Sequence, residues 1–281
     1  MIIKHDEPLK NYTTFRMGGF AKTIFFPENI EDIELLYDKN GDAFSYILGG
    51  GSNLLINDSH YFGEVICLKM LNVKIIREGD GVYQIGGGMR LQKIINEING
   101  DGYGGIEYLY SVPGLLGGAI YMNAGRGPTH HQCISDYLES VTVFINGQVR
   151  TLKKEECAFS HRYSAFQDMV NPIILDAHFR FHNEEKDKLR GARESRMKLV
   201  KEKQDNTKPN FGSVFCKSNT KIMKILCSIS NKKGVHYSKK TPNWLLNDNG
   251  TYEQAIHEIK KAERLHKIMR QSCKREIIIW D

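Results

Sequence analysis

The 281-residue sequence has no C-x-x-C pair among its six cysteines, and no H-E-x-x-H motif or Cys/His quartet. These absences argue against a metal site, and scattered cysteines are typical of reduced thiols in a cytosolic protein. A run of about 18 apolar residues is also missing, as is an apolar segment near the N-terminus. We therefore expect a soluble, cytoplasmic protein with no membrane association and no bound metal.

The composition supports stable cores, because 41% of the residues are hydrophobic and 26% are charged. This excludes a disordered chain, and the length suffices for one large domain or for two or three small ones. The 39 lysines and arginines exceed the 33 acidic residues, which gives a net charge of +6. Such a balance favours small polyanionic ligands. Nucleic acid is not an expected partner, because no RNA-binding aromatic motif or long basic tail is present.

The chain changes character after about residue 182. Short apolar runs punctuated by glycine fill residues 20–181 and predict strands with interleaved helices. Residues 183–208 are dense in alternating charge and predict a solvated helix. We therefore predict an α+β fold in which residues 1–182 form the larger domain, in two lobes that meet near residue 70, and residues 183–281 form a smaller α+β domain.

The smaller domain is predicted to end in a helix and a strand. Residues 252–270 show helical spacing of apolar residues, and Thr251 with Gln254 forms a capping-box pattern. Residues 275–280 predict an apolar strand that carries one carboxylate, Glu276. Glu276 is either functional or a charge that protects an edge strand from aggregation. Whether this strand packs back on the N-terminal lobe is left open.

Two glycine-rich segments are candidates for ligand binding. Taken alone, each is readily explained as a structural turn, and the first is neither a Walker loop nor a Rossmann fingerprint. Backbone N–H groups in such turns can bind a pyrophosphate. Two glycine-rich segments upstream of a smaller domain therefore favour a dinucleotide ligand. The first segment comprises Leu48, Gly49, Gly50, Gly51, Ser52, Asn53 and Leu54; the second contributes Pro113, Gly114, Gly117, Gly118, Ala119, Asn123 and Gly125.

Further motifs follow one another along nearly the whole chain. They are Asn11-Tyr12-Thr13-Thr14-Phe15, the two glycine-rich segments, Arg162 with Ser164 and Phe166, Gly212-Ser213-Val214-Phe215, and Glu276. In this combination the chain resembles the UDP-N-acetylenolpyruvoylglucosamine reductases, also called UDP-N-acetylmuramate dehydrogenases, of the compact type.

The resemblance implies a two-lobed FAD-binding domain of the vanillyl-alcohol-oxidase type and a smaller α+β substrate domain. It also implies FAD as cofactor, held by the two glycine-rich segments, and NADPH as co-substrate. The implied reaction reduces a UDP-sugar, enolpyruvyl-UDP-N-acetylglucosamine, to UDP-N-acetylmuramate for peptidoglycan synthesis. The oligomeric state stays open, with a monomer favoured.

The same resemblance assigns roles to three polar residues. Arg162 would bind and polarise the substrate carboxylate, a task suited to a permanently charged fork. Ser213 would protonate the adjacent carbon, and Glu276 would stabilise the enolic intermediate. Without the resemblance, Arg162 would be read as a surface ion-pair arginine and Ser213 as a turn serine.

The motifs depart from the family pattern mainly in the substrate domain. His161 stands where the family has tyrosine, Lys217 follows Ser213 in place of an expected amide-containing motif, and Ser238-Lys239-Lys240-Thr241 lacks a histidine. We expect His161, Lys217 and Lys240 to contact substrate. Two alternatives stay open, namely a divergent paralogue that reduces another unsaturated nucleotide-sugar and a flavin-binding protein without turnover.

Overall fold

The computed structural model describes residues 1–40, 46–126, 132–230 and 233–281, and the chain folds into two compact units. Unit 1 comprises Met1–His5, Thr23–Gly50 and Glu64–Lys198. Unit 2 comprises Asp6–Lys22, Gly51–Gly63 and Leu199–Asp281. None of the helices formed by the described residues is long and apolar enough to cross a bilayer.

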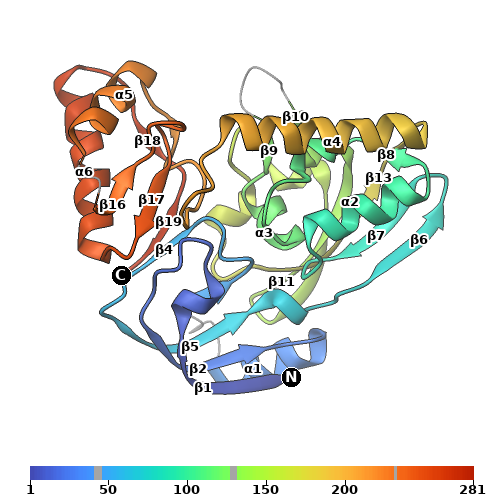
Figure 1. Cartoon of the computed structure of the whole chain (residues 1–281). Helices are drawn as coiled ribbons and strands as arrows, with labels where there is room; N and C mark the ends of the chain where they lie inside the picture. The colour runs from blue at the N-terminus through green and yellow to red at the C-terminus, as the bar shows by residue number, and fades with distance from the viewer. Residues whose placement is uncertain (41–45, 127–131, 231–232) are drawn as a thin grey trace. The chain divides into compact units, whose positions relative to one another are not determined.

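The centre of unit 1 is a five-stranded antiparallel sheet (Figure 1). Residues of β13 alternate between two cores, because Ala177 and Phe179 pack in one cluster while Ile173 and Leu175 pack in another. The first cluster lies under α2 (Leu91–Gly100) and α3 (Leu116–Tyr121), and the second includes α1 (Ile30–Asn40). The strand order is β12 (Gln148–Lys153), β11 (Leu138–Ile145), β13 (Ile173–Arg180), β7 (Val82–Gly86) and β6 (Ile75–Gly79).

Smaller elements complete the first part of the chain. A four-stranded sheet has the order β1 (Ile2–Pro8), β2 (Phe20–Phe26), β5 (Tyr61–Cys67) and β3 (Tyr46–Leu48), and its first three strands contribute residues to both units. Two short pairs are β8 (Tyr103–Gly104) with β14 (His182–Asn183) and β9 (Gly125–Arg126) with β10 (Gln132–Cys133). Short 3₁₀ turns are η2 (Leu68–Met70), η3 (Glu107–Leu109), η4 (Ile134–Tyr137), η5 (Lys154–Cys157) and η6 (Ala165–Asp168).

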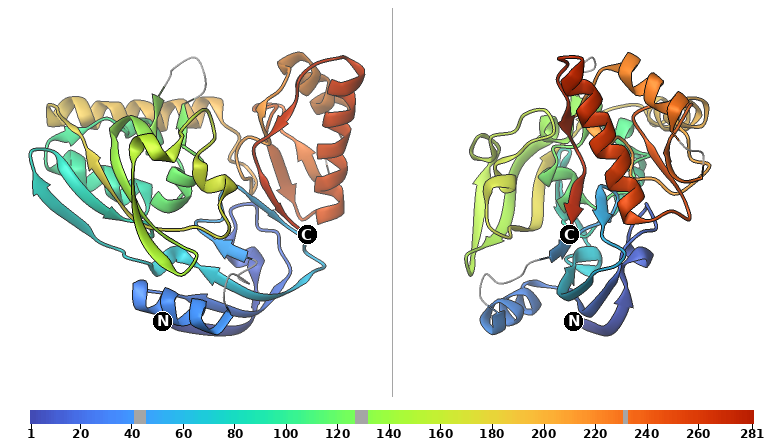
Figure 2. Two further views of the ribbon diagram at one scale, coloured as in Figure 1. Left: turned by 180° about the vertical axis from the view of Figure 1, so that it is seen from behind. Right: turned by 90° about the vertical axis from the view of Figure 1, so that its left-hand side faces the viewer.

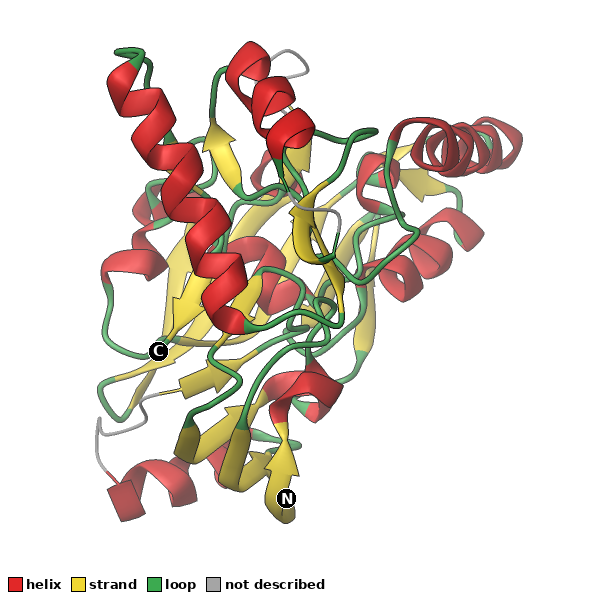
Figure 3. Cartoon of the chain, turned by 60° about the vertical axis from the view of Figure 1, so that its left-hand side comes forward, coloured by secondary structure: helices red, strands yellow, loops and turns green. Residues whose placement is uncertain are grey.

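Unit 2 is built on the antiparallel hairpin of β16 (Gly234–Tyr237) and β17 (Leu245–Asp248), against which α5 (Thr220–Ile229) and α6 (Tyr252–Ile268) pack (Figure 3). Its other elements are η1 (Leu9–Tyr12), β4 (Leu54–Ile56), β15 (Phe215–Lys217), β18 (Lys274–Arg275) and β19 (Ile278–Trp280). Phe15, Met17 and Leu55 belong to this core although they lie early in the sequence.

The two units do not divide the chain at the predicted boundary after residue 182. The charged helix predicted there is observed as α4 (Lys186–Lys203), but unit 1 continues along it to Lys198. The reason is packing, since Leu189 is buried and its side chain lies directly over Gly104. The lobe boundary near residue 70 and the separate substrate domain stay predictions.

The predicted strand at 275–280 is interrupted, and Glu276 lies between β18 and β19. The backbone changes partner at this point, because Arg275 pairs with Phe215 of β15 whereas Ile278 pairs with Leu54 of β4. The parallel β4–β19 pair joins the end of the chain to its N-terminal part, as the two views of Figure 2 show. The packing that the sequence left open is therefore observed within unit 2.

The predicted capping box of α6 is confirmed, with Thr251 Oγ1 accepting from Gln254 N–H and Gln254 accepting from Thr251 N–H. We predict that Thr251→Ala lowers the free energy of unfolding by about 1 kcal/mol, because a backbone N–H loses its acceptor. Thr251→Ser retains the hydroxyl and is the control. Urea unfolding should separate the two variants, and equal stability would contradict a capping role.

Candidate functional site

Unit 1 brings part of both glycine-rich segments together. Gly50 follows β3, and a Cβ added to it would lie 3.3 Å from Gly114 Cα, from Leu115 N and from the Pro113 carbonyl oxygen. A side chain at Gly50 would push the two segments apart. The N–H of Gly50 has no backbone acceptor among the described residues, so it is available to an anionic ligand. Leu48 is fully buried at the end of β3 and fixes where this turn begins.

The second segment forms a turn and the short helix α3 rather than a loop throughout. Gly117 is buried, and its N–H donates to the Gly87 carbonyl at 2.9 Å. Gly118, in contrast, is exposed, and a Cβ added to Gly118 or to partly buried Gly49 would have nothing within 4 Å. These two glycines leave open space beside the main chain. Ala119 is buried, and Gly125 begins β9.

Asn123 is the most constrained residue of this segment. It is 3% exposed and has a left-handed backbone with φ of 41°. Its side-chain amide donates to the Ser160 carbonyl at 2.8 Å, while its Oδ1 is buried without a donor in the described part of the chain. A buried acceptor without a donor is costly, so this oxygen fits a ligand N–H. A free glycine amide, open glycine faces and this acceptor together fit FAD.

Arg162 lies in a two-residue turn next to this segment. Ser160 and Tyr163 exchange two backbone hydrogen bonds of 3.1 Å, and the turn places exposed His161 beside partly buried Arg162. Arg162 has φ of 58°, in the left-handed region that non-glycine residues rarely adopt. Gln167 Nε2 bridges the Arg162 and Tyr121 carbonyls at 3.1 and 3.0 Å. The turn is therefore fastened to the end of α3.

The thiol of Cys133 lies near the same turn. Burial raises its pKa, Asp136 raises it further, and the Arg162 guanidinium acts in the opposite direction. Cys133 is therefore held as a neutral thiol.

In unit 2, the backbone around Ser213 is held by Asn243. Gly212 has φ of 79°, so the turn before Ser213 uses a conformation suited to glycine. Val214 N–H donates to the Asn243 carbonyl at 2.9 Å, and the Asn243 side chain donates to the Phe215 carbonyl at 2.7 Å. Asn243 was not predicted from the sequence, although Pro242-Asn243 is a turn signal that points to it.

Glu276 and Asn53 lie on the segments that adjoin Ser213. Glu276 N–H donates to the Val214 carbonyl at 2.8 Å, and Asn53 Nδ2 donates to the Glu276 carbonyl at 3.1 Å. Ile278 N–H returns a bond to the Asn53 carbonyl at 3.0 Å. Unit 2 thus brings together two predicted catalytic residues and one predicted cofactor contact. Gly51 is buried against Tyr12, where a Cβ would lie 2.0 Å from its carbonyl oxygen, and Ser52 and Leu54 complete the turn.

Asp205 anchors the loop that leads to Ser213. Its carboxylate accepts from Ser238 Oγ and from Thr207 Oγ1, both at 2.6 Å, and its N–H donates to Thr241 Oγ1 at 3.0 Å. Burial acts to raise the pKa of Asp205, but the hydrogen bonds from Ser238 and Thr207 outweigh it and hold the pKa below its ordinary value. Thr241, which stands at the expected histidine position, therefore has a structural task.

The two predicted substrate lysines are both exposed. Lys217 ends β15 opposite Lys274. Lys240 Nζ donates to the Lys201 carbonyl at 2.8 Å, so this ammonium group is already used within unit 2. Contact of either lysine with substrate stays a prediction.

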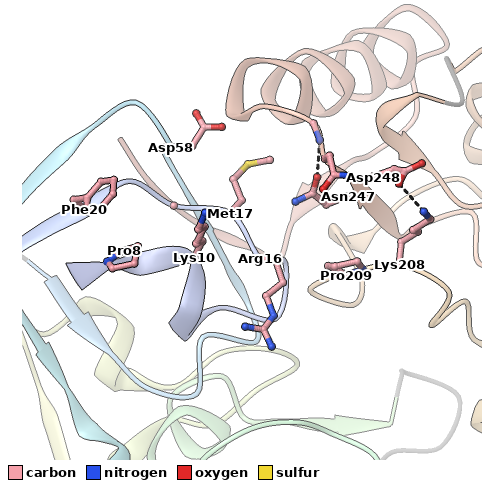
Figure 4. A pocket seen from close by; sticks show the side chains of 13 residues that line it. Pro8, Lys10, Arg16, Met17, Phe20, Asp58, Lys208, Pro209, Asn247 and Asp248 are labelled. Atoms are coloured by element: carbon pink, nitrogen blue, oxygen red, sulfur yellow. Dashed lines mark hydrogen bonds and ion pairs between the residues drawn. The ribbon is translucent and has the colours of Figure 1, made fainter. Parts of the chain in front are cut away.

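A cavity of about 520 Å³ lies in unit 2 (Figure 4). Lys208 and Asp248 form an ion pair of 2.6 Å in its wall, and Asn247 N–H donates to the Pro209 carbonyl at 2.9 Å. The cavity adjoins the loop before Ser213 but includes none of the predicted site residues. It is lined by Pro8, Lys10, Arg16, Met17, Gly18, Phe20, Asp58, Lys208, Pro209, Asn247, Asp248, Asn249 and Gly250.

The comparisons with known proteins agree with this geometry. Residues 21–153 match a family of FAD binding domains. The paired glycine segments and this match define a flavoprotein with an FAD-binding domain.

Relatives along the whole chain are more specific. The UDP-N-acetylenolpyruvoylglucosamine reductase of Fusobacterium nucleatum is 32% identical over 91% of this chain and 91% of its own length. The enzyme of that name from Clostridium botulinum strain Hall is 33% identical over 87% of this chain and 81% of its own. The chain belongs to the UDP-N-acetylenolpyruvoylglucosamine reductase family. A crystal structure of the reductase from Thermus caldophilus has the same fold, with a TM-score of 0.81, full coverage of both chains and 22% identity.

The left-handed backbone of Arg162 predicts a stability difference between two truncations. Arg162→Gly and Arg162→Ala both remove the guanidinium, but only alanine keeps a Cβ at φ of 58°. We expect the glycine variant to be more stable by about 1 kcal/mol in urea unfolding. A more stable alanine variant would show that the turn is not strained.

The lowered pKa of Asp205 predicts an acid dependence of stability. Because the folded-state pKa lies below the ordinary value of 3.8, the carboxylate stabilises the fold above that pH, and this contribution is lost as the pH falls through the folded pKa. The stability difference between wild type and Asp205→Asn should therefore shrink during acid titration below pH ~4. Asp187→Asn, at an exposed carboxylate, is the control. A difference independent of pH would contradict the assignment.

Proposed function

We propose that this chain catalyses NADPH-dependent reduction of enolpyruvyl-UDP-N-acetylglucosamine to UDP-N-acetylmuramate, a step of peptidoglycan precursor synthesis. The observation that carries the proposal is the placement of Ser213, Glu276 and Asn53 on adjoining backbone segments of a family member. The two glycine-rich segments would hold FAD, which would supply hydride transfer from NADPH to the enolpyruvyl double bond.

Residues of the chain stabilise the negative charge on the substrate and supply a proton to it. Arg162 binds the substrate carboxylate while negative charge develops on it. The hydrogen-bonded turn that carries Arg162 holds the guanidinium in position. Ser213 Oγ–H gives a proton to the carbon that bears this carboxylate. A hydroxyl is a weak acid, so its position matters, and the bonds of Asn243 to residues 214 and 215 supply that position. Glu276 stabilises the enolic intermediate.

Other assignments belong to the same proposal. His161, Lys217 and Lys240 contact the UDP-sugar, and both glycine-rich segments contact FAD. The protein acts in the cytoplasm, where its nucleotide ligands are found, as a monomer. The domain that binds the UDP-sugar lies within residues 183–281.

Substitution of Ser213 separates the two half-reactions. We expect Ser213→Ala to allow NADPH to bleach the bound flavin at the wild-type rate, because no proton from Ser213 enters that step. Reoxidation by the UDP-sugar should slow by about 10²-fold or more, as for loss of a positioned general acid. Anaerobic stopped-flow spectroscopy measures both steps.

Ser228→Ala, at an exposed serine on α5, is the control and should leave both steps unchanged. Equal loss of both half-reactions in Ser213→Ala would overturn the assignment of Ser213 as proton donor. Normal bleaching by wild type without reoxidation by this substrate would point instead to another unsaturated nucleotide-sugar.

A further inference from the structure

Two arginines of α4 project onto the segment just before the second glycine-rich segment. Arg196 Nε donates to Ser111 Oγ at 2.9 Å. One turn earlier, Arg193 places its guanidinium carbon 5.6 Å from the centre of the Tyr110 ring. Arg193 Nη1 also donates to Asn96 Oδ1 at 2.5 Å. Both arginines are partly buried, so their positions are set by packing as well as by charge.

A third arginine lies close to the same place. Arg126 ends β9, which contacts η3, the turn that leads into Tyr110 and Ser111. Burial lowers the pKa of Arg196, and the charge of Arg126 lowers it further. The two guanidinium groups therefore repel each other. Together with Arg193 they form what we call the arginine cluster.

The arginine cluster lacks a carboxylate. None of its members forms an ion pair with a described residue. On α4, the positions three and four residues from Arg196 are occupied by Ala192, Arg193, Leu199 and Val200. The segment after Arg126, residues 127–131, contains no Asp or Glu either. The arginine cluster is therefore not paired with any carboxylate of the described residues.

Arg193 adds an independent sign of a missing partner. Its Nε is buried and has no acceptor among the described residues. A buried charged donor without an acceptor is strongly disfavoured, and partly buried cations are normally paired. If these side chains only packed α4 against unit 1, a neutral side chain would do so with a smaller desolvation penalty than an arginine. Some anion that is not part of the chain should therefore complete this cluster.

We propose that Arg126, Arg193 and Arg196 bind a phosphate group of a nucleotide ligand beside the second glycine-rich segment. Guanidinium forks match phosphate oxygens in geometry and stay charged when desolvated. Ser111 is two residues from Pro113, so the arginine cluster lies at the edge of the segment assigned to FAD. The choice of a nucleotide rests on the proposed function, in which FAD, NADPH and the UDP-sugar all carry phosphates. The charge argument does not depend on it.

Binding measurements on the full-length holoprotein test this proposal. The first arm measures the dissociation constant of FAD, and the second measures the rise in unfolding temperature caused by inorganic pyrophosphate. Arg126→Met and Arg196→Met should weaken the binding of one of these ligands by at least about tenfold, as for loss of a charge-assisted hydrogen bond. Weaker binding of FAD would identify the cofactor as the source of the phosphate. Weaker binding of pyrophosphate would identify an exchanging nucleotide.

Two control variants separate binding from a structural role. Arg190→Met lies on the same helix and removes an exposed arginine paired with Asp187, so it should leave both ligands unaffected. Ser111→Ala removes the Arg196–Ser111 hydrogen bond but keeps the charge, so its effect on either ligand should be less than about twofold. The proposal is overturned if neither ligand is weakened in the Arg126 and Arg196 variants. It is also overturned if Ser111→Ala matches Arg196→Met in every measurement.

The result is independent of turnover. A protein that fails to reduce enolpyruvyl-UDP-N-acetylglucosamine but loses pyrophosphate binding on Arg196→Met would refute the proposed function and support the phosphate site. Normal turnover together with unchanged ligand binding in the arginine variants would support the proposed function and refute the phosphate site.

Discussion

The hydrogen bond from Glu276 N–H to the Val214 carbonyl, 2.8 Å long, is the constraint on which the arrangement of unit 2 depends. It holds the end of the chain against the segment that carries Ser213. Directly afterwards the backbone leaves β15 and joins β4, which brings Asn53 to Glu276 across 223 positions of sequence. The strand is interrupted at Glu276, so its backbone N–H bonds to one neighbouring segment and its carbonyl to another.

In unit 1, two of the predicted site residues are positioned by a different means, which is backbone strain held by packing. Asn123 and Arg162 both have positive φ, and the Asn123 side chain reaches the carbonyl of Ser160 in the turn that presents Arg162. Such conformations persist only where the surroundings leave no alternative, and they are common at functional sites. Here the buried end of α3 and the side chain of Gln167 provide those surroundings. In the arginine cluster, the surrounding packing likewise holds positively charged groups close together.

Hydrophobic periodicity, charge and capping residues predicted the elements that depend on neighbouring residues in the sequence. The capping box at Thr251 and the charged helix after residue 183 are both observed. Helix α5 was missed although Asn219 caps it. The division into units and the break at Glu276 depend on pairings between distant segments, which periodicity does not encode. Both glycine-rich segments were recognised, but their approach at Gly50 and the anchors Asn243 and Asp205 required the structure.

Electrons from NADPH are expected to reach an enolpyruvyl nucleotide-sugar through flavin bound to this chain. The most direct measurement is an anaerobic titration of the wild-type protein. NADPH is added until the flavin absorbance is bleached, and enolpyruvyl-UDP-N-acetylglucosamine is then added in stoichiometric amount. We expect the oxidised flavin spectrum to return and UDP-N-acetylmuramate to form in the same amount. A flavin that stays bleached, or a protein that binds no flavin, would contradict this expectation.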